Sequence, residues 1–267
     1  MKPSLNLKEI QALILDMDGV LWQGEQPIGD LPRIFSIIAE LGWKVILATN
    51  NATRSSDQFI QKMERFGVHL EPWQVINSPE VTVRYLKHKY PLGGALYIIG
   101  EEGLKQTLLH SGFYHAEKDV LAVVVGLDRE INYEKLTRAT LLIRSGVPFI
   151  GTNPDRTYPM PEGLVPGAGS VIAAVETATD VKPVIMGKPM PEMYSACLER
   201  LQIKAENALV VGDRTETDIA AGQVLGCRTA LVLSGATTLE TARAWKPAPD
   251  WIGKDLMTLV SEAFPRS

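Results

Sequence analysis

Two aspartates near the start of the chain, Asp16 and Asp18, stand one residue apart directly after an apolar run, Gln11 to Leu15. Side chains two positions apart point to the same side of an extended chain. Two carboxylates at a partly buried edge are costly without a counter-charge, which a bound cation can supply. Mg²⁺ prefers oxygen ligands and is commonly held by one or two carboxylates together with water and substrate phosphate. The pair therefore predicts a magnesium site at which a phosphate group reacts.

Further polar groups stand at the ends of other apolar segments. In a doubly wound sheet, ligands bind outside the carboxyl ends of the parallel strands, so groups distant in sequence converge there. The candidates are Thr49, Asn50 and Asn51 after Lys44 to Ala48, Lys188 after a short apolar segment, and Asp213 after Ala208 to Val211.

These residue types suit transfer of a phosphoryl group to an aspartate. Asp16 and Asp213 are the natural side-chain ligands of the metal, and Asp18 could add its backbone carbonyl. With the metal and Lys188 neutralising the phosphate, an aspartate oxygen can attack phosphorus without being repelled. The Asp18 side chain is then placed to protonate the leaving oxygen and later to deprotonate water.

The segment after Lys44 to Ala48 provides candidates for holding the phosphate. Thr49 and the backbone amide of Asn50 would bind its oxygens at a strand end that leads into a helix. Asn51 has three open roles: it binds phosphate, positions Asp16, or shapes a turn.

The elements that must position these groups alternate between strand and helix. Gln11 to Leu15 and Lys44 to Ala48 are typical of buried parallel strands, and apolar residues recur at helical spacing between them, from Leu31 to Leu41. The same alternation returns late in the chain, with helices at Glu192 to Leu201 and Thr217 to Leu225 and strands at Ala208 to Val211 and Thr229 to Leu233.

The middle of the chain has an alternation of its own. We expect strands at Ala95 to Ile99, Val120 to Gly126 and Pro148 to Gly151, and helices near Glu102 to Ser111 and Tyr133 to Ser145. Turn-rich segments bracket this part. We therefore predict a doubly wound, Rossmann-like parallel α/β core of residues 1–79 and 183–267, with a smaller α/β cap inserted at residues 80–182.

A long segment rich in Pro and Gly, Thr152 to Gly169, is expected to be a loop, and loops of this length are often functional. Its residues Asn153, Asp155 and Arg156 are candidates for substrate specificity. Asn153-Pro154-Asp155 could equally be a turn, because these residue types favour turns.

Four segments together resemble, in order and placement, the four motifs of the haloacid dehalogenase (HAD) superfamily of phosphatases. They are Asp16-x-Asp18-Gly19-Val20, Thr49-Asn50-Asn51, Lys188-Pro189 and Gly212-Asp213-x-x-x-x-Asp218. The insert between the second and third motifs, with Gly151 to Asp155, resembles subfamily IIA, whose members carry a C2-type cap. This branch includes NagD-type nucleotide phosphatases and phosphatases of p-nitrophenyl phosphate, phosphoglycolate and pyridoxal phosphate.

By this resemblance, Asp16 is the nucleophile and Asp18 the acid and base. An aspartate two positions after the nucleophile is typical of the family's phosphatases and absent from its dehalogenases, which disfavours carbon–halogen hydrolysis. The resemblance also implies that Asp213 is a further metal ligand, that Thr49 and Lys188 bind phosphate, and that Asp218 supports the metal or the lysine. Asp218 could instead cap the nearby helix, since Asp is favoured at helix starts.

Composition narrows the classes of partner. A formal net charge of -4 offers no basic footprint for nucleic acid. No apolar run approaches the roughly 20 residues that span a bilayer, and the first residues lack the apolar stretch of a signal peptide. The two cysteines suit a reducing cytoplasm. We expect a cytoplasmic enzyme for a small phosphorylated metabolite; the resemblance also implies that cap surfaces can pair in a homodimer.

Two other functions use similar residues. A phospho-receiver domain of a signalling protein also forms a phosphoryl-aspartate, but such receivers are much shorter, pair adjacent acids and need no cap. A non-catalytic protein that binds phosphometabolites is the second alternative, and the intact set of Asp16, Asp18, Lys188 and Asp213 disfavours it. Which phosphate ester is used stays open.

Overall fold

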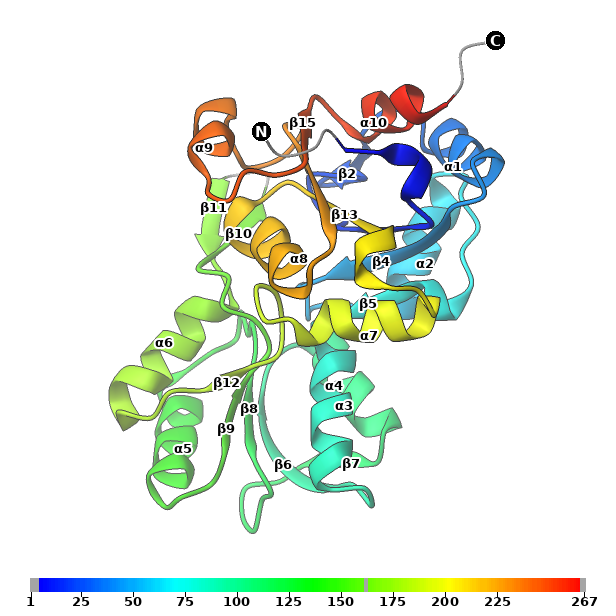
Figure 1. The fold of residues 1–267 in the computed structure, drawn as a ribbon. Helices are drawn as coiled ribbons and strands as arrows, with labels where there is room; N and C mark the ends of the chain where they lie inside the picture. The colour runs from blue at the N-terminus through cyan, green and yellow to red at the C-terminus, as the bar shows by residue number, and fades with distance from the viewer. Residues whose placement is uncertain (1–4, 161–162, 265–267) are drawn as a thin grey trace. The chain divides into compact units, whose positions relative to one another are not determined.

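The computed structural model describes residues 5–160 and 163–264, which form two compact units (Figure 1). The core unit takes the described residues of Met1–Thr49, Phe59–Ile76 and Lys188–Ser267, and the insert unit takes Asn50–Gln58 and Asn77–Gly187. The chain passes between the units after residues 49, 58, 76 and 187, and the domain boundaries at residues 79 and 182 stay a prediction. The grouping of Asn50–Gln58 with the insert unit was not predicted.

The core unit is built on a six-stranded sheet in the order β15-β14-β13-β1-β4-β5. β1 pairs in parallel with β4 and β13, and β14 pairs in parallel with β13 and β15. Early and late segments of the chain thus meet at β1. The strands are β1 (Ala12–Leu15), β4 (Lys44–Thr49), β5 (Val75–Asn77), β13 (Ala208–Gly212), β14 (Arg228–Val232) and β15 (Trp251–Gly253).

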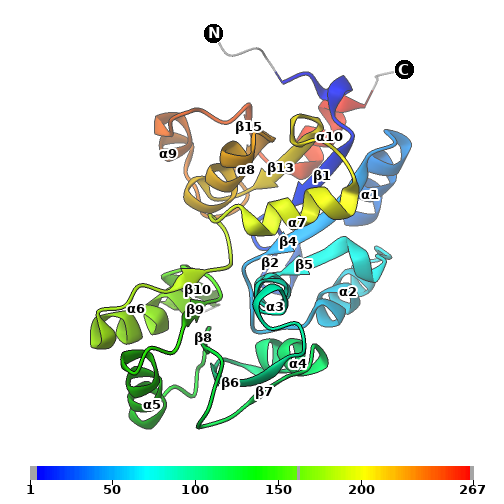
Figure 2. The ribbon, with the colours of Figure 1, turned by 60° about the horizontal axis from the view of Figure 1, so that its bottom comes forward.

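Helices cover both faces of this sheet, which confirms the predicted doubly wound fold. One layer holds α7 (Glu192–Leu201) and α8 (Ala220–Leu225), and the other holds α1 (Leu31–Glu40) and α10 (Leu256–Ala263), as Figure 2 shows. The largest apolar cluster joins Leu13 and Leu15 of β1 to Ile34 and Ile38 of α1. α2 (Ser56–Arg65) adds Phe59 and Met63 to the same cluster, and α9 (Leu239–Ala244) packs near β14.

Smaller elements complete the core unit. A two-stranded hairpin of β2 (Trp22–Gln23) and β3 (Gln26–Pro27) follows the first motif, and a π-helical turn, η4 (Thr215–Ile219), precedes α8. Short 3-10 turns are η1 (Leu7–Glu9), η2 (Pro72–Gln74) and η3 (Ala205–Asn207).

The insert unit has a five-stranded sheet of its own, in the order β12-β9-β8-β6-β7, with every pair parallel. α5 (Tyr133–Arg144) and α6 (Ala168–Thr179) pack side by side, as do α3 (Ser78–Lys89) and α4 (Glu102–His110) (Figure 1). The predicted α/β character of the insert is confirmed. Its strands are β6 (Gly94–Ile99), β7 (Phe113–His115), β8 (Val123–Val125), β9 (Phe149–Gly151) and β12 (Val184–Ile185).

The expectation of a loop without secondary structure between Thr152 and Gly169 is wrong. This segment contains an antiparallel hairpin of β10 (Thr157–Met160) and β11 (Gly163–Pro166). Proline is tolerated in such a two-stranded ribbon because edge positions need no donated hydrogen bond.

Several helices begin where the sequence supplies an oxygen for the unpaired backbone amides of the first turn. Asp30 accepts from Arg33 N at the start of α1, Asn77 accepts from Glu80 N at α3, and Asp255 accepts from Thr258 N at α10. Within the described ranges, no helix has both the length and the apolarity needed to cross a membrane.

Candidate active site

The carboxyl ends of the central strands bring acidic residues together. Asp16 follows β1 and Asp213 follows β13, and the parallel register of Leu15 with Val211 sets these two residues at one edge of the sheet. Both side chains are buried. One carboxylate oxygen from each of Asp16, Asp213 and Asp218 lies within 4.8 Å of the other two. The structure therefore brings Asp16 close to two acids that lie about 200 residues later in the sequence.

Lys188 is the cation of this cluster. Its Nζ donates to Asp16 Oδ1 at 2.8 Å, to Asp218 Oδ1 at 2.7 Å and to the backbone oxygen of Ala48 at 3.1 Å. Only 2% of the residue is exposed. A buried ammonium needs such partners, because desolvation of an unpaired charge costs several kcal/mol.

Asp218 has hydrogen-bond donors on both carboxylate oxygens. Oδ1 accepts from Lys188 Nζ and from the Tyr194 hydroxyl at 3.2 Å, while Oδ2 accepts from Arg214 N at 3.1 Å. The backbone bond joins Asp218 to Arg214, the residue before the η4 turn, so Asp218 both fixes the start of this turn and pairs with the lysine. The structure thus shows the contact of Asp218 with the lysine, and its support of a metal stays a prediction.

Burial and repulsion from neighbouring carboxylates raise the pKa values of Asp16 and Asp213. Burial raises the pKa of Asp16 well above its usual value, against the attraction of Lys188. Burial, followed by repulsion from Asp218, raises the pKa of Asp213 to about 6. Burial alone would lower the pKa of Lys188, but Asp16 and Asp218 raise it above its usual value, so the lysine remains charged.

A loop after β14 holds Asp213 from the other side. The backbone amide of Ala236 donates to Asp213 Oδ2 at 2.7 Å. A Cβ atom at Gly235 would lie 2.0 Å from this oxygen and one at Gly19 would lie 2.5 Å from it, so both positions require glycine. Ser234 Oγ donates to the backbone oxygen of Gly19 at 2.7 Å and ties the two loops together.

This Ser-Gly-Ala loop is not among the predicted site residues. Its place directly after a predicted apolar strand, Thr229 to Leu233, was the signal that could have identified it.

Asp18 is half-buried beside the first strand end. Its Oδ1 accepts a hydrogen bond of 2.8 Å from the indole Nε1 of Trp22. The backbone amide of Gly19 donates to Trp22 O at 2.8 Å, which closes the turn that carries both residues. Trp22 is a partner of Asp18 that was not predicted from the sequence.

The second motif is divided between the two units. Thr49 is the buried last residue of β4 in the core unit, whereas Asn50 and Asn51 belong to the insert unit. Asn51 Oδ1 accepts from Thr53 N at 2.9 Å and from Thr53 Oγ1 at 2.7 Å. Of its three predicted roles, the shaping of a turn is therefore seen directly.

In the insert unit, Asn50 is bound to the segment that was predicted to set specificity. Asn50 Nδ2 donates to both oxygens of Asp155 at 3.2 Å, and Asn153 Nδ2 donates to Asn50 O at 2.8 Å. The Asn153 side chain thus fixes the backbone rather than forming only a local turn. Arg156 is exposed, and its backbone oxygen accepts from Gly167 N at 2.9 Å and from Ser170 Oγ at 2.7 Å.

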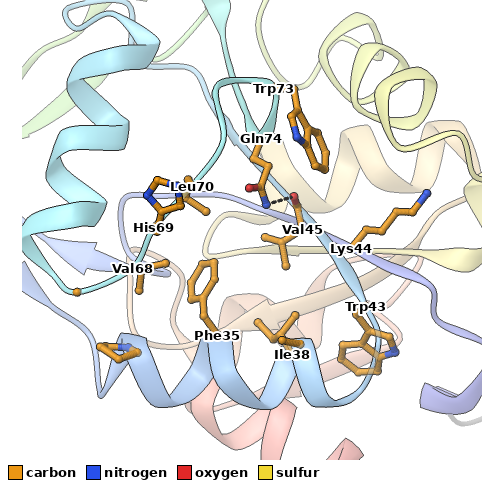
Figure 3. A pocket seen from close by; sticks show the side chains of 13 residues that line it. Phe35, Ile38, Trp43, Lys44, Val45, Val68, His69, Leu70, Trp73 and Gln74 are labelled. Carbon is orange, nitrogen blue, oxygen red and sulfur yellow. Dashed lines mark hydrogen bonds between the residues drawn. The ribbon is translucent and has the colours of Figure 1, made fainter.

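A cavity of about 430 Å³ also lies in the core unit. Figure 3 shows the side chains that line it. Its lining includes Phe35, Trp43 and Trp73 together with Lys44 and Val45, the first two residues of β4. The acids stand at the carboxyl ends of the strands, whereas this cavity adjoins the amino end of β4. A strand of this length spans about 20 Å. The cavity is therefore separate from the candidate active site.

Comparison with known proteins identifies the family. A model described as haloacid dehalogenase-like hydrolase matches residues 13–114, and one described as HAD-hydrolase-like matches residues 185–259. An acid sugar phosphatase from Staphylococcus aureus is 33% identical over 257 residues, which cover 96% of this chain and 99% of the relative.

Solved structures of phosphatases also match nearly the whole chain. The 4-nitrophenylphosphatase from Thermotoga maritima matches with a TM-score of 0.91 and 31% identity, covering 96% of this chain and 98% of that one. A glycerol phosphate phosphatase from Mycobacterium tuberculosis, solved in complex with magnesium, has a TM-score of 0.87 and 32% identity, covering 96% of this chain and 78% of that one. The predicted resemblance is thereby confirmed: the chain belongs to the HAD superfamily, as a phosphatase of the subfamily IIA branch that includes NagD and the p-nitrophenyl phosphatases.

Proposed function

We propose that the protein is a magnesium-dependent phosphatase that hydrolyses small phosphorylated metabolites through a phosphoryl-aspartate on Asp16. The observation that carries this proposal is the buried contact between Asp16 and Lys188 at the end of β1, with the acids Asp213 and Asp218 beside it. A carboxylate next to a fixed ammonium can meet a phosphate dianion without prohibitive repulsion.

The charges of the cluster suit a divalent cation. Three carboxylates face one ammonium, so an excess of two negative charges arises when all three acids are ionised. Oxygen donors of this kind are the ligands that Mg²⁺ prefers. The carboxylates of Asp16 and Asp213 and the backbone carbonyl of Asp18 would hold the ion, while Asp218 keeps its donors. When bound, Mg²⁺ supplies positive charge that offsets the phosphate and stabilises the transition state.

The reaction has two half-reactions. In the first, a carboxylate oxygen of Asp16 forms a bond to phosphorus as the ester P–O bond breaks, and Asp18 gives its proton to the leaving oxygen. In the second, Asp18 takes a proton from water as the water oxygen attacks phosphorus, and the Asp16–phosphorus bond breaks to release inorganic phosphate. Lys188 keeps its positive charge throughout, and this charge offsets the negative charge of the phosphoryl oxygens.

Small phosphate esters are the proposed substrates. The relatives named above act, by their names, on acid sugar phosphates, 4-nitrophenyl phosphate and glycerol phosphate. Thr49, Asn50 and Asn51 are proposed to bind the phosphate, and Asn153, Asp155 and Arg156 to contribute to specificity. A cytoplasmic location and a homodimer stay predictions; sedimentation equilibrium of the purified protein tests the dimer.

The test is phosphate release from a panel of phosphometabolites, with magnesium and with chelator, by wild type and Asp16→Asn. We expect magnesium-dependent release that is lost in the variant, because an amide is not a competent nucleophile. Normal turnover by Asp16→Asn would overturn the proposed intermediate. Tight ester binding without release would favour a binding protein, and slow self-dephosphorylation after treatment with acetyl phosphate, without ester turnover, would favour a receiver.

A further inference from the structure

In the described part of the chain, the side chain of Asp18 accepts a hydrogen bond from the indole of Trp22. The Nε1 to Oδ1 distance of 2.8 Å is that of a strong hydrogen bond to a carboxylate. Asp18 itself is half-buried, so its side chain is not held by close packing on all sides. The orientation of its carboxyl group therefore depends on what fixes Trp22.

Trp22 is held from several directions. Only 1% of the residue is exposed. Its ring stacks on Phe59 with centroids 6.4 Å apart and an interplanar angle of 12°, and it meets Phe66 at 6.1 Å. The buried Lys62 places its Nζ 4.5 Å from the ring centroid. These contacts leave the indole little freedom to rotate.

The side chain of Lys62 is itself fixed, because its backbone belongs to a helix and its ammonium group is hydrogen-bonded. It extends from α2, and its Nζ donates to the backbone oxygen of Gly24 at 2.6 Å and to Glu25 Oε1 at 3.4 Å. The lysine thus ties α2 to the turn of the β2–β3 hairpin while its charge rests on the indole face, an attraction that strengthens on desolvation. The chain of contacts runs from Lys62 through Trp22 to Asp18.

We propose that Trp22 is a positioning residue that orients the carboxyl group of Asp18 for both proton transfers; this inference rests on the proposed function. An indole N–H donates and cannot accept. The bond therefore engages Oδ1 as an acceptor and leaves Oδ2 to exchange the proton with the leaving oxygen and with water. Placement matters because a misplacement of about 1 Å can cost on the order of 100-fold in rate.

The test compares two substrates whose leaving groups differ. An alkoxide, as from glycerol phosphate, needs a proton as it departs, whereas p-nitrophenolate does not. In Trp22→Phe, which keeps the stacked ring and removes the donor, we expect kcat/KM for glycerol phosphate to fall about 10- to 100-fold. For p-nitrophenyl phosphate, kcat/KM should change less than about threefold, and a burst of p-nitrophenolate should appear because the second half-reaction is slowed.

The matched control is Trp43→Phe, the same change at a buried tryptophan on the distant cavity, which should leave both substrates unaffected. Equal losses on the two substrates in Trp22→Phe, or no loss on either, would overturn the proposal. Asp18→Asn is measured in parallel. If it shows the leaving-group selectivity and Trp22→Phe does not, only the Trp22 inference fails; if Asp18→Asn retains full activity on glycerol phosphate, the proposed function fails.

Discussion

Lys188 links the chemistry of the core unit to its stability at the scale of a single residue. It touches Asp16, Asp218 and the backbone of Ala48, so three segments of the chain depend on one ammonium group. The same contacts that would prepare Asp16 for attack also compensate two buried negative charges.

Substitution of Lys188 tests whether its ammonium group supports both stability and turnover. In Lys188→Met, Asp16 and Asp218 lose their counter-charge, and we expect a loss of about 3–5 kcal/mol in the free energy of unfolding together with loss of turnover. Urea denaturation followed by circular dichroism measures the first effect. Lys44→Met, which removes an ammonium bound to Leu201 O at 2.9 Å, is the control and should cost far less. If Lys188→Met had the same midpoint of urea denaturation as the wild type, the stabilising role of the pairing of Lys188 with Asp16 and Asp218 would be contradicted.

The raised pKa of Asp213 predicts how stability changes with pH. Its pKa moves from 3.8 to about 6, so the folded state binds this proton more tightly than the unfolded state. The contribution to stability is therefore full below pH 3.8 and is lost as the pH rises through about 6. In metal-free protein this loss amounts to roughly 2–4 kcal/mol.

Metal binding should oppose that loss, because a cation favours the ionised carboxylate. We expect Mg²⁺ to raise Tm more above about pH 7 than below about pH 5. Asp213→Asn should be more stable than wild type without metal at the higher pH and should lose the Mg²⁺ response. A response to Mg²⁺ that is independent of pH in the wild type would refute the assignment.

The closeness of Asp16 and Asp213 could be predicted because each follows an apolar strand and parallel strands end at one edge of the sheet. The hydrogen bonds from Trp22 to Asp18 and from Ala236 to Asp213 could not be predicted. They depend on how turns direct an indole and a backbone amide in space, which hydrophobic periodicity does not encode.

At the scale of an element, the η4 turn determines where Asp218 lies. This π-helical turn packs directly on the end of β13, and a Cβ atom at Gly212 would lie 2.2 Å from the Cβ of Asp218. The closeness of strand and helix therefore requires glycine at this position.

Gly212→Ala should push the η4 turn away from the sheet and weaken the bond between Asp218 and Lys188. We expect a loss of about 1–3 kcal/mol in the free energy of unfolding and a fall in kcat. Gly222→Ala lies in α8, the helix that follows η4, and serves as the matched control, because its Cβ would crowd Thr229 at 2.9 Å and Val210 at 3.2 Å. It should cost stability with much less effect on kcat per folded molecule; equal kcat in the two variants would argue against this role of Gly212.

Elements with strong periodicity were predictable, and the β10–β11 hairpin was not. Prolines at 159 and 166 and glycine at 163 indicate a loop when taken singly. Pairing of the two segments, with Thr157 opposite Pro166, overrides that local preference.

At the scale of the whole molecule, both cysteines are buried thiols in the core unit. Cys197 lies in α7 and Cys227 directly precedes β14, and neither forms a disulfide. Burial raises the pKa of Cys227 to about 12, which keeps its reactive thiolate scarce at neutral pH. Reductant should therefore have no structural effect.

Thiol titration checks this expectation. Both cysteines should react with a thiol reagent only after denaturation, and dithiothreitol should leave Tm unchanged. Rapid labelling of the native protein would show that one of these positions opens.

The strand order has a consequence for folding during synthesis on the ribosome. β1 lies between β4, made within the first 49 residues, and β13, which begins at residue 208. At a translation rate of about 5–20 residues per second, the edge of β1 that pairs with β13 stays unpaired for on the order of ten seconds. The insert unit, with a sheet of its own, is synthesised during that interval. Lys188, Asp213 and Asp218 all emerge afterwards, so a nascent chain lacks part of the candidate active site until residue 218 has been translated.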